Sequence, residues 1–325
     1  MPQSESGPPS PWPMSEHELA QVRSFNRKLA WLPRFRVRNR LAPRLMQVLL
    51  QASQIGGDAK LSRQGVTVET RTVAVGNASV RVRIIRPAGP VKGVVLDYHG
   101  GGWVLGNAQM NDGFNIAIAN TCHVAVVSVD YRLAVSTPVE GLMDDCLCAA
   151  RWLLDEGNRE FGGLPVVVVG ESAGGHLAAS TLLSLKAYPG LLERVSGALL
   201  YYGVYDLTGT ASVRSAPRDT LVLDGPGMVD ALRLLTPGLT DQARQRPPLS
   251  PLYGDLSGMP PALMFVGDLD PLRDDTLDMA ARWAGCAPVD MHLLPACPHG
   301  FIHFPTDLAA RVLTYSRAWI TARIG

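Results

Sequence analysis

A serine flanked by glycines is the residue of this chain whose setting best suits covalent chemistry. Ser172 lies within Gly170–Gly175, directly after the β-branched run Val166–Val169 and directly before a helix-like stretch. A short continuous apolar run of this kind is typical of a buried strand. The glycines permit a turn too tight for side chains, and such a strand-to-helix turn holds the serine hydroxyl out over the edge of a sheet. The pattern predicts a serine nucleophile.

A second glycine-rich segment, His99–Trp103, also follows a strand-like run, Val91–Tyr98. Its bare backbone can turn N–H groups toward a carbonyl oxygen that gains negative charge during a reaction. We expect His99 to fix this loop by hydrogen bonding rather than to transfer a proton, because it precedes the serine and lies inside the glycine segment. Together, in this order, the two segments predict acyl transfer from an ester or a similar carbonyl substrate.

A serine hydroxyl attacks a carbonyl only when a base takes its proton, and an acidic side chain must orient that base. In open α/β sheets such partners lie beyond the carboxyl ends of the strands. Two candidates follow late strands: Asp270 comes after Ala262–Val266, and His299 comes after Val289–Leu294. We therefore expect these two side chains to meet the serine at one edge of the sheet.

Neighbouring side chains could take the same parts. Asp268 lies in the same loop as Asp270 and could orient the base in its place. His303 could replace His299, although we expect it in or near the last helix. Glu171, beside the serine, could tune the nucleophile, but a carboxylate in this position more often supports the loop. The residues alone favour Asp270 and His299 and leave the alternatives open.

The candidate catalytic residues can meet only if the strands before them end at the same edge of one sheet. The rest of the sequence has the pattern of such a sheet. Two strand-like runs at hairpin spacing are followed by alternating strand-like and helix-like segments, which predicts a mostly parallel sheet with helices on both faces. The strand-like runs are Val66–Val75, Val80–Arg86, Val91–Tyr98, Val124–Asp130, Val166–Val169, Val195–Tyr201, Ala262–Val266 and Val289–Leu294. The helix-like stretches are Val139–Glu156, Ala173–Lys186, Asp275–Ala284 and Ala309–Ile324.

Three regions stand outside this alternation. Residues 1–15 are rich in Pro and Ser and lack the basic and apolar regions of a signal peptide, which predicts a disordered tail. Residues 15–54 have a helical pattern interrupted by Pro33 and Pro43. Their arginines are expected on a solvated helix face, with a basic rim for anionic substrates as the alternative. The interval 206–249, with its Pro and Gly residues, predicts a helical insertion that forms part of a lid. The arginines of residues 15–54 for which these two interpretations are considered are Arg34, Arg36, Arg38, Arg40 and Arg44.

The composition limits the classes of function. With 46% hydrophobic and 18% charged residues and a net charge of +1, the chain is typical of a soluble globular protein without electrostatic bias toward nucleic acids or membranes. Its five cysteines include no Cys-x-x-Cys pair, which argues against a disulfide framework or a zinc site. No apolar run reaches the ~18–20 residues of a membrane span. We expect a cytoplasmic protein with no metal, organic cofactor, nucleic-acid partner or membrane insertion.

Five separated motifs between Val91 and Phe301 resemble the hormone-sensitive-lipase-like branch of the α/β-hydrolase esterases. The resemblance implies the α/β-hydrolase fold, with an eight-stranded, mostly parallel sheet, helices on both faces and a helical cap. The order serine, aspartate, histidine along the chain is also the order expected of α/β-hydrolases. The motifs are His99–Trp103, Asp130–Ala134, Gly170–Gly175, Ser250–Ala262 and Asp270–Asp274.

The same resemblance implies a role for each candidate. Ser172 would be the nucleophile, His299 the base and Asp270 the acid that orients it, which favours Asp270 over Asp268. Backbone N–H groups would form an oxyanion hole, and three further residues would support the loops around it. The oxyanion-hole residues are Gly100, Gly101 and Ala173, and the supporting residues are His99, Gly102 and Glu171.

The resemblance also implies a division of the chain. After the tail, residues 16–60 would form N-terminal cap helices and residues 61–325 the catalytic domain, whose insertion at about 206–249 completes the cap. One segment departs from the family: Val135–Pro138 stands where its members usually continue with Pro-Glu and a Pro-rich loop. The loop near the pocket, and with it the substrate range, is therefore expected to differ. Edge strands and a last helix at the end of the sheet make a homodimer an option.

These observations predict a carboxylic ester hydrolase that acts on short-to-medium acyl esters through a serine acyl-enzyme. Within the same chemistry, an amidase such as an aryl formamidase is the alternative, because only the leaving group differs. A non-catalytic small-ligand receptor is the alternative from another class. The plant gibberellin receptors resemble this family but lack the catalytic histidine, whereas this chain has His299.

Overall fold

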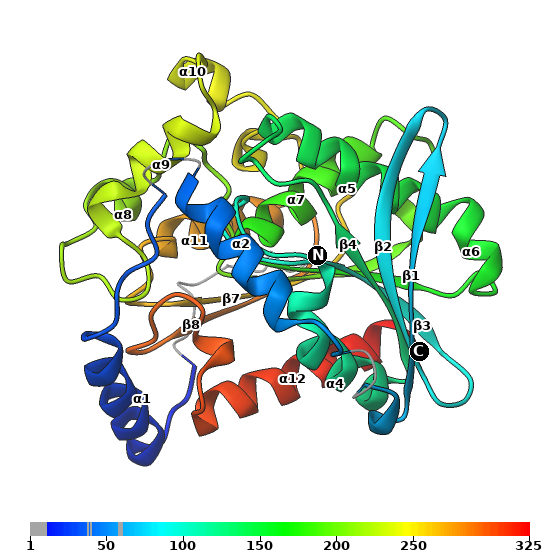
Figure 1. The fold of residues 1–325 in the computed structure, drawn as a ribbon, viewed down its shortest axis with the longest axis horizontal. Coiled ribbons are helices and arrows are strands. Elements are labelled where there is room, and N and C mark those ends of the chain that lie inside the picture. The colour runs from blue at the N-terminus through cyan, green and yellow to red at the C-terminus, as the bar shows by residue number, and fades with distance from the viewer. Residues whose placement is uncertain (1–11, 38, 40, 58–60) are drawn as a thin grey trace, which may run out of the picture.

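The computed structural model of the chain describes residues 12–37, 39, 41–57 and 61–325, with an eight-stranded sheet at its centre (Figure 1). The strand order is β1-β2-β4-β3-β5-β6-β7-β8. The pairs β1–β2 and β2–β4 are antiparallel, and the other neighbouring pairs are parallel. The predicted mostly parallel sheet is confirmed. The strands are β1 (Val66–Val75), β2 (Ala78–Pro87), β3 (Gly93–Tyr98), β4 (Val124–Asp130), β5 (Val166–Glu171), β6 (Val195–Tyr201), β7 (Ala262–Gly267) and β8 (Val289–Leu294).

Helices cover both faces of this sheet, as predicted. Successive side chains of a strand point to opposite faces, so Val94 and Leu96 of β3 lie in one core and Val95 lies in the other. Helices α5, α7 and α11 pack on the first face, and α4 and α12 pack on the second (Figure 1). These helices are α4 (Asp112–Cys122), α5 (Val139–Leu154), α7 (Ala173–Leu185), α11 (Arg273–Ala284) and α12 (Asp307–Arg323), and the short α6 (Glu156–Glu160) follows α5.

Helix α4 was not among the predicted helices. Its sequence has no clean apolar stripe because polar residues are buried along it together with Ile116 and Ile118. Asn115 is fully buried and donates a hydrogen bond to Asp97 of β3 at 2.9 Å. The helix is therefore held by a buried polar contact as well as by apolar packing, and a search for helical hydrophobic periodicity misses it.

The N-terminal region begins earlier than the sequence suggested. Trp12 is buried against Phe265 and His292, so the expected tail of residues 1–15 is too long at its C-terminal end; residues 1–11 lie outside the described part. Ser15 then caps helix α1 (Glu16–Leu29) in a reciprocal pair of hydrogen bonds with Glu18. Helix α2 (Leu41–Ser53) follows after an irregular segment, and Pro43 lies in its first turn, where proline is tolerated.

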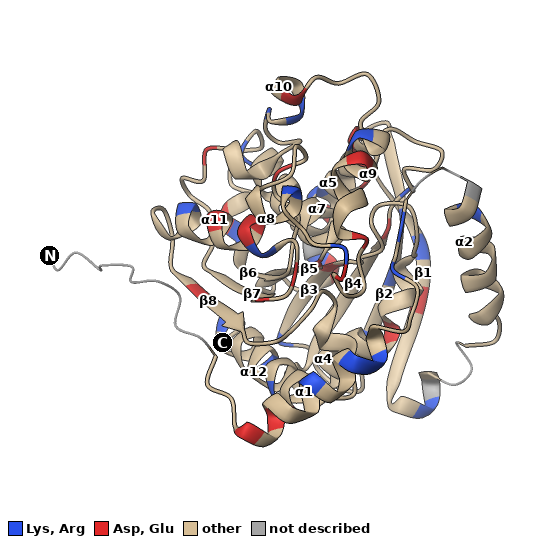
Figure 2. Ribbon diagram, turned by 90° about the vertical axis from the view of Figure 1, so that its left-hand side faces the viewer, with Lys and Arg blue, Asp and Glu red and all other residues tan. Residues whose placement is uncertain are grey.

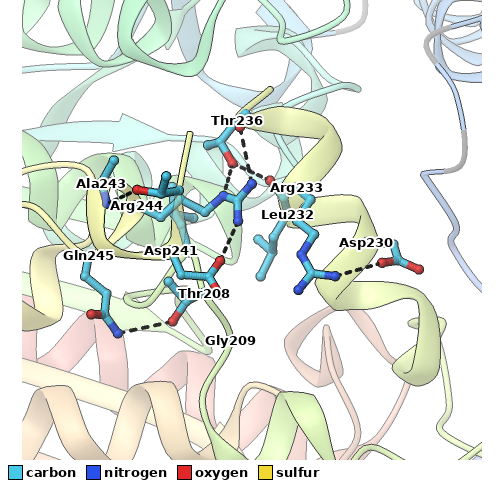
Figure 3. Close-up of polar contacts among 12 residues, drawn as sticks. Thr208, Gly209, Asp230, Leu232, Arg233, Thr236, Asp241, Ala243, Arg244 and Gln245 are labelled. Carbon is cyan, nitrogen blue, oxygen red and sulfur yellow. Dashed lines mark hydrogen bonds and ion pairs between the residues drawn. The ribbon is translucent and has the colours of Figure 1, made fainter. Parts of the chain in front are cut away.

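The interval 206–249 contains three short helices, α8 (Ala211–Arg214), α9 (Met228–Leu235) and α10 (Asp241–Arg244). A buried arginine joins the last two of them (Figure 3). Arg244 donates from Nε to Thr236 Oγ1 at 2.7 Å and from Nη1 to Asp241 Oδ1 at 2.6 Å. Because Thr236 directly follows α9 and caps its C-terminus, this arginine fixes the C-terminal end of that helix.

Replacing the buried arginine is expected to loosen α9. Arg244→Met keeps an apolar stem but removes both donors, so we expect the free energy of unfolding to fall by about 1–3 kcal/mol. The matched control is Arg233→Met, since Arg233 is half exposed on α9 and pairs with Asp230 at 3.5 Å (Figure 3). That exposed pair should contribute less than about 0.5 kcal/mol. Urea unfolding of both variants checks this; equal losses would contradict it.

Candidate active site

Ser172 occupies a strained turn between β5 and α7. Its backbone has φ 54° and ψ −119°, a conformation that costs free energy for any residue with a side chain. The flanking glycines make the turn possible. A Cβ on Gly170 would lie 2.4 Å from the carbonyl oxygen of Gly174, and a Cβ on Gly174 would lie 1.9 Å from that of Tyr98. The strand-to-helix turn expected from the sequence is therefore present, with the serine at its tip.

The structure brings the three predicted side chains together from the ends of three strands. His299 Nε2 lies 2.9 Å from Ser172 Oγ, and His299 Nδ1 lies 2.8 Å from Asp270 Oδ2. With the proton on Nδ1, the imidazole donates to Asp270 and accepts from the serine hydroxyl. The other carboxylate oxygen of Asp270 accepts a hydrogen bond from the Leu272 amide at 2.9 Å. The side chain of Asp270 is fully buried, so its orientation is fixed.

The two alternatives from the sequence lie elsewhere. Asp268 is in the same loop, but His299 is hydrogen-bonded to Asp270 and not to it; Asp268 Oδ1 is buried without a hydrogen-bond partner among the described residues. Burial raises the pKa of the Asp268 carboxyl. His303 lies in a short 3-10 helix (Phe301–His303) before α12, and its Nε2 is 2.6 Å from Glu171 Oε2. The geometry favours Asp270 and His299.

The glycine segment after β3 is held by His99 and its neighbours. The imidazole stacks on Tyr131 with ring centroids 4.1 Å apart, and its Nδ1 donates to the Gly100 carbonyl at 2.7 Å. Burial lowers the pKa of His99 to about 4, against the opposing effect of that hydrogen bond, so the ring is neutral at neutral pH. The Tyr131 hydroxyl donates to the His99 carbonyl at 2.6 Å. His99 is thus placed to fix the loop, with a neutral ring.

The remaining predicted residues border the serine. Gly101 has φ 108°, and a Cβ there would lie 2.0 Å from the Leu105 carbonyl oxygen, so only glycine fits this turn. Gly102 lines the same cavity as Ser172. Gly100 packs closely against Glu171: a Cβ added to Gly100 would lie 3.3 Å from the Cγ atom of Glu171. Ala173 is the first residue of α7, and the N–H groups of a helix's first turn have no partner within the helix.

Glu171 is the centre of a second polar cluster beside the serine. Its Oε2 accepts a hydrogen bond from the Tyr202 hydroxyl at 3.0 Å and lies 2.6 Å from His303 Nε2. The Tyr202 ring in turn packs edge-on against His299, with centroids 4.7 Å apart. Burial alone would raise the pKa of the Glu171 carboxyl, but the hydrogen bond and charge of His303 and the hydrogen bond of Tyr202 lower it overall. This cluster connects the segment of the nucleophile with that of the base.

Sequence reasoning missed the part of Tyr202 and His303 in this cluster. His303 was weighed only as a substitute base, and Tyr202 was not singled out. A usable signal exists for Tyr202, because it follows β6 directly and the residues after parallel strands gather at the same edge of the sheet. No comparable signal marks His303.

The pair of Glu171 and His303 makes stability depend on pH. Burial lowers the pKa of His303, but the hydrogen bond and charge of Glu171 raise it overall from 6.5. Its contribution is therefore complete below pH 6.5 and is lost as the pH rises through the raised pKa. The lowered pKa of Glu171 gives a contribution that is complete above pH 4.5 and is lost as the pH falls through the lowered value.

His303→Gln is therefore expected to destabilise the protein more at pH 6 than at pH 9. Since the His303 side chain is half exposed, we expect a loss of about 1 kcal/mol at pH 6. His17→Gln is the control, because His17 is exposed and lies 3.6 Å from Asp307. Urea unfolding at the two pH values measures both variants. An effect of His303→Gln that does not change with pH would disprove the ion pair.

A cavity of about 710 Å³ opens over the serine. Its walls are mostly apolar and come from the irregular segment before α2, from the glycine loop and from α9. Arg36 is exposed, as expected, and also pairs with Asp224 at 3.1 Å, while the partly buried Arg34 donates to the Thr220 carbonyl at 3.0 Å. Both contacts join the N-terminal segment to the interval 206–249; Arg38 and Arg40 lie outside the described residues. The apolar lining includes Phe35, Trp103, Val204, Met228, Leu232 and Leu235.

The atypical segment Val135–Pro138 does not line this cavity. Val135 and Ser136 border a different, more polar hollow of about 530 Å³ between α2 and the end of β4. The Val135 carbonyl accepts a hydrogen bond from Arg44 at 2.9 Å. The atypical segment therefore lies beside α2, and its residues are absent from the described lining of the Ser172 cavity.

The chain has clear relatives among characterised families. A family model described as the alpha/beta hydrolase fold matches residues 95–303, a range that includes Ser172, Asp270 and His299. The chain is 35% identical to the carboxylesterase NlhH of Mycobacterium tuberculosis over 252 residues, which cover 73% of this chain and 76% of that protein. It is 34% identical to the carboxylic ester hydrolase LipN of the same organism over 237 residues, which cover 69% of this chain and 61% of that protein.

Solved structures show the same relationship. The esterase LipW from Mycobacterium marinum superposes with a TM-score of 0.79 at 29% identity, over 92% of this chain and 95% of that chain. A bacterial heroin esterase superposes with a TM-score of 0.80 at 26% identity, over 95% of this chain and 98% of that chain. The family match, the sequence relatives and the superposed structures thus agree on the same fold. The chain belongs to the hormone-sensitive-lipase-like branch of the α/β-hydrolase family and is a homologue of carboxylesterases.

Proposed function

We propose that this protein hydrolyses carboxylic esters with short-to-medium acyl chains through a covalent acyl-enzyme. Ser172 is the nucleophile, His299 is the general base, and Asp270 orients it. The observation that carries the proposal is the chain of hydrogen bonds from Ser172 through His299 to the buried Asp270, at 2.9 and 2.8 Å, with Ser172 lining a cavity whose walls are mostly apolar. The names of relatives such as carboxylesterase NlhH support the same chemistry.

In the first step the serine oxygen attacks the ester carbonyl while His299 takes the hydroxyl proton. The imidazolium that forms is stabilised by Asp270, which also keeps the ring in the tautomer with the proton on Nδ1. The negative charge on the carbonyl oxygen meets the N–H groups of Gly100, Gly101 and Ala173, and each such donor contributes about 3–4 kcal/mol to the transition state. His299 then gives its proton to the leaving alcohol oxygen.

In the second step a water molecule gives a proton to His299 and attacks the acyl-enzyme carbonyl. Collapse of that intermediate releases the acid and returns the proton to the serine oxygen. His99, Gly102 and Glu171 support the loops that carry the donors. The apolar walls of the 710 Å³ cavity support an acyl or alcohol group of modest length as the part of the substrate held there.

A series of p-nitrophenyl esters from acetyl to dodecanoyl tests this proposal. We expect turnover to be fastest within the short-to-medium part of the series, and a fluorophosphonate to label the folded protein at Ser172. Faster hydrolysis of a matched anilide would favour an amidase. Failure of the folded protein to react with both the probe and the esters would favour a ligand-binding protein.

A further inference from the structure

Helix α2 turns its polar side chains toward the rest of the protein. The Gln47 side chain forms two hydrogen bonds with the backbone of Gly106, donating at 2.9 Å and accepting at 2.8 Å. Just past the end of the helix, Gln54 and Asn107 pair through their amides at 2.7 and 3.1 Å. A surface helix normally packs its apolar side inward. Here hydrogen bonds of side-chain amides hold the helix in place, and its apolar side does not face inward.

That apolar side faces solvent. Leu45, Val48 and Leu49 are 64%, 60% and 62% exposed, and Ile55, just past the end of the helix, is 85% exposed. We call these four residues the α2 stripe; the spacing of its first three members places them on one side of the helix. Seven of the ten large apolar side chains that are exposed in the described part of the chain lie between Trp31 and Ile55. Such a concentration marks an interaction surface.

The charges around the stripe indicate the partner. Residues 31–60, which include α2 and the segments next to it in sequence, contain six basic residues and one acidic residue, Asp58. In Figure 2, α2 shows blue at one end and no red along its length. Arg36 is neutralised by Asp224, whereas Arg44 at the start of α2 is exposed and bonds only to a carbonyl among the described groups. An apolar helix side accompanied by cations is typical of helices that lie in the interface of anionic membranes.

Two other occupants fit less well. A second copy of the chain would bring two segments of the same positive charge together, which opposes pairing of the stripes. Residues 1–11 could not cover four large apolar side chains, because Met1 is their only large apolar residue. A membrane surface instead supplies both apolar depth and negative charge.

We propose that the α2 stripe docks this protein on membrane surfaces that contain anionic phospholipid. This docking is peripheral, and within the described ranges no helix is long and apolar enough to cross a bilayer. The segment that leads into α2 contains Phe35 and Val37, which line the Ser172 cavity. Docking would therefore hold the cavity close to apolar esters dissolved in the lipid, a consequence that rests on the proposed function, whereas the docking itself does not.

Sedimentation of the full chain with lipid vesicles tests the proposal. The probes are vesicles of phosphatidylcholine alone and of phosphatidylcholine mixed with phosphatidylglycerol, at low and high salt. We expect binding to the mixed vesicles, weakened by salt because the lipid and arginine charges are screened. The double variant Leu45→Gln/Leu49→Gln should bind at least about tenfold less. Ser53→Gln, an exposed change on the same helix that keeps the stripe, should bind like the parent protein.

Turnover of a water-soluble short-chain ester shows whether each variant is folded, and it should stay unchanged in all of them. Should the double variant lose that activity, Ile55→Gln replaces it, with an expected decrease in binding of about threefold. Absence of binding to mixed vesicles at low salt overturns the proposal, as does equal binding by the double variant. A dimer that the double variant loses would show that the stripe contacts a second copy. A protein that binds vesicles but hydrolyses no ester would contradict only the proposed function.

Discussion

Ser172→Ala is expected to lower kcat/KM for a short-chain p-nitrophenyl ester by about 10⁴-fold or more, with little change in KM. The serine oxygen is the atom that forms the acyl-enzyme in the proposed mechanism. His299 lies 2.9 Å from that oxygen, and in the alanine variant this base has no hydroxyl proton to take. Substrate still enters the cavity, whose apolar walls are unchanged, and therefore KM is affected far less than kcat.

The matched control is Ser184→Ala on the same helix. The Ser184 hydroxyl donates to the Ser180 carbonyl at 2.9 Å, away from the cavity, and its loss should change activity less than about twofold. A fluorophosphonate should label the parent protein and the control at one site and leave Ser172→Ala unlabelled. Labelling of the Ser172→Ala variant, or activity near the parent value, would show that another residue is the nucleophile.

The active-site turn could be predicted because its constraints are local. Gly170 and Gly174 admit a backbone approach that any Cβ would block, so their spacing around Ser172 carries the geometry within a few residues. Asp270 and His299 could be placed because each directly follows a strand, and parallel strands bring such residues to one edge. The choice between Asp268 and Asp270 needed the resemblance to a family, since both lie in the same loop.

What the sequence did not reveal depends on contacts between distant segments. Helix α4 was missed because Asn115 is buried by its bond to Asp97, a partner in another element that hydrophobic periodicity cannot register. The cluster of Glu171, Tyr202 and His303 joins residues up to 132 positions apart. No local pattern predicts that pairing.

Helix α2 shows a third limit. Its period marks an apolar and a polar side, but not which of the two packs inward. The polar side is inward because the Gly106 backbone and the Asn107 amide offer hydrogen-bond partners to Gln47 and Gln54. The orientation of an amphipathic helix therefore depends on which of its polar groups find hydrogen-bond partners on the neighbouring segments.

Asp270→Asn is expected to lower kcat by about 10⁴-fold while KM changes little. The substitution keeps the volume of the side chain, and the fold should tolerate it. An amide, however, can present its N–H₂ group to His299 Nδ1, which favours the tautomer whose Nε2 carries the proton. In that tautomer the imidazole cannot accept the proton of the serine hydroxyl, and the imidazolium of the transition state also loses its counter-charge.

Asp268→Asn is the decisive comparison, because the same change of charge is made two residues away in the same loop. Asp268 has no hydrogen bond to His299, and the pKa of its partly buried carboxyl is raised, so replacing it with an amide should change kcat less than about threefold. Steady-state kinetics of both variants, with thermal unfolding as a check on folding, separates the two acids. A larger loss of kcat in Asp268→Asn would reassign the orienting role, because the hydrogen bond between His299 and Asp270 would then not be the one that sets the tautomer during turnover.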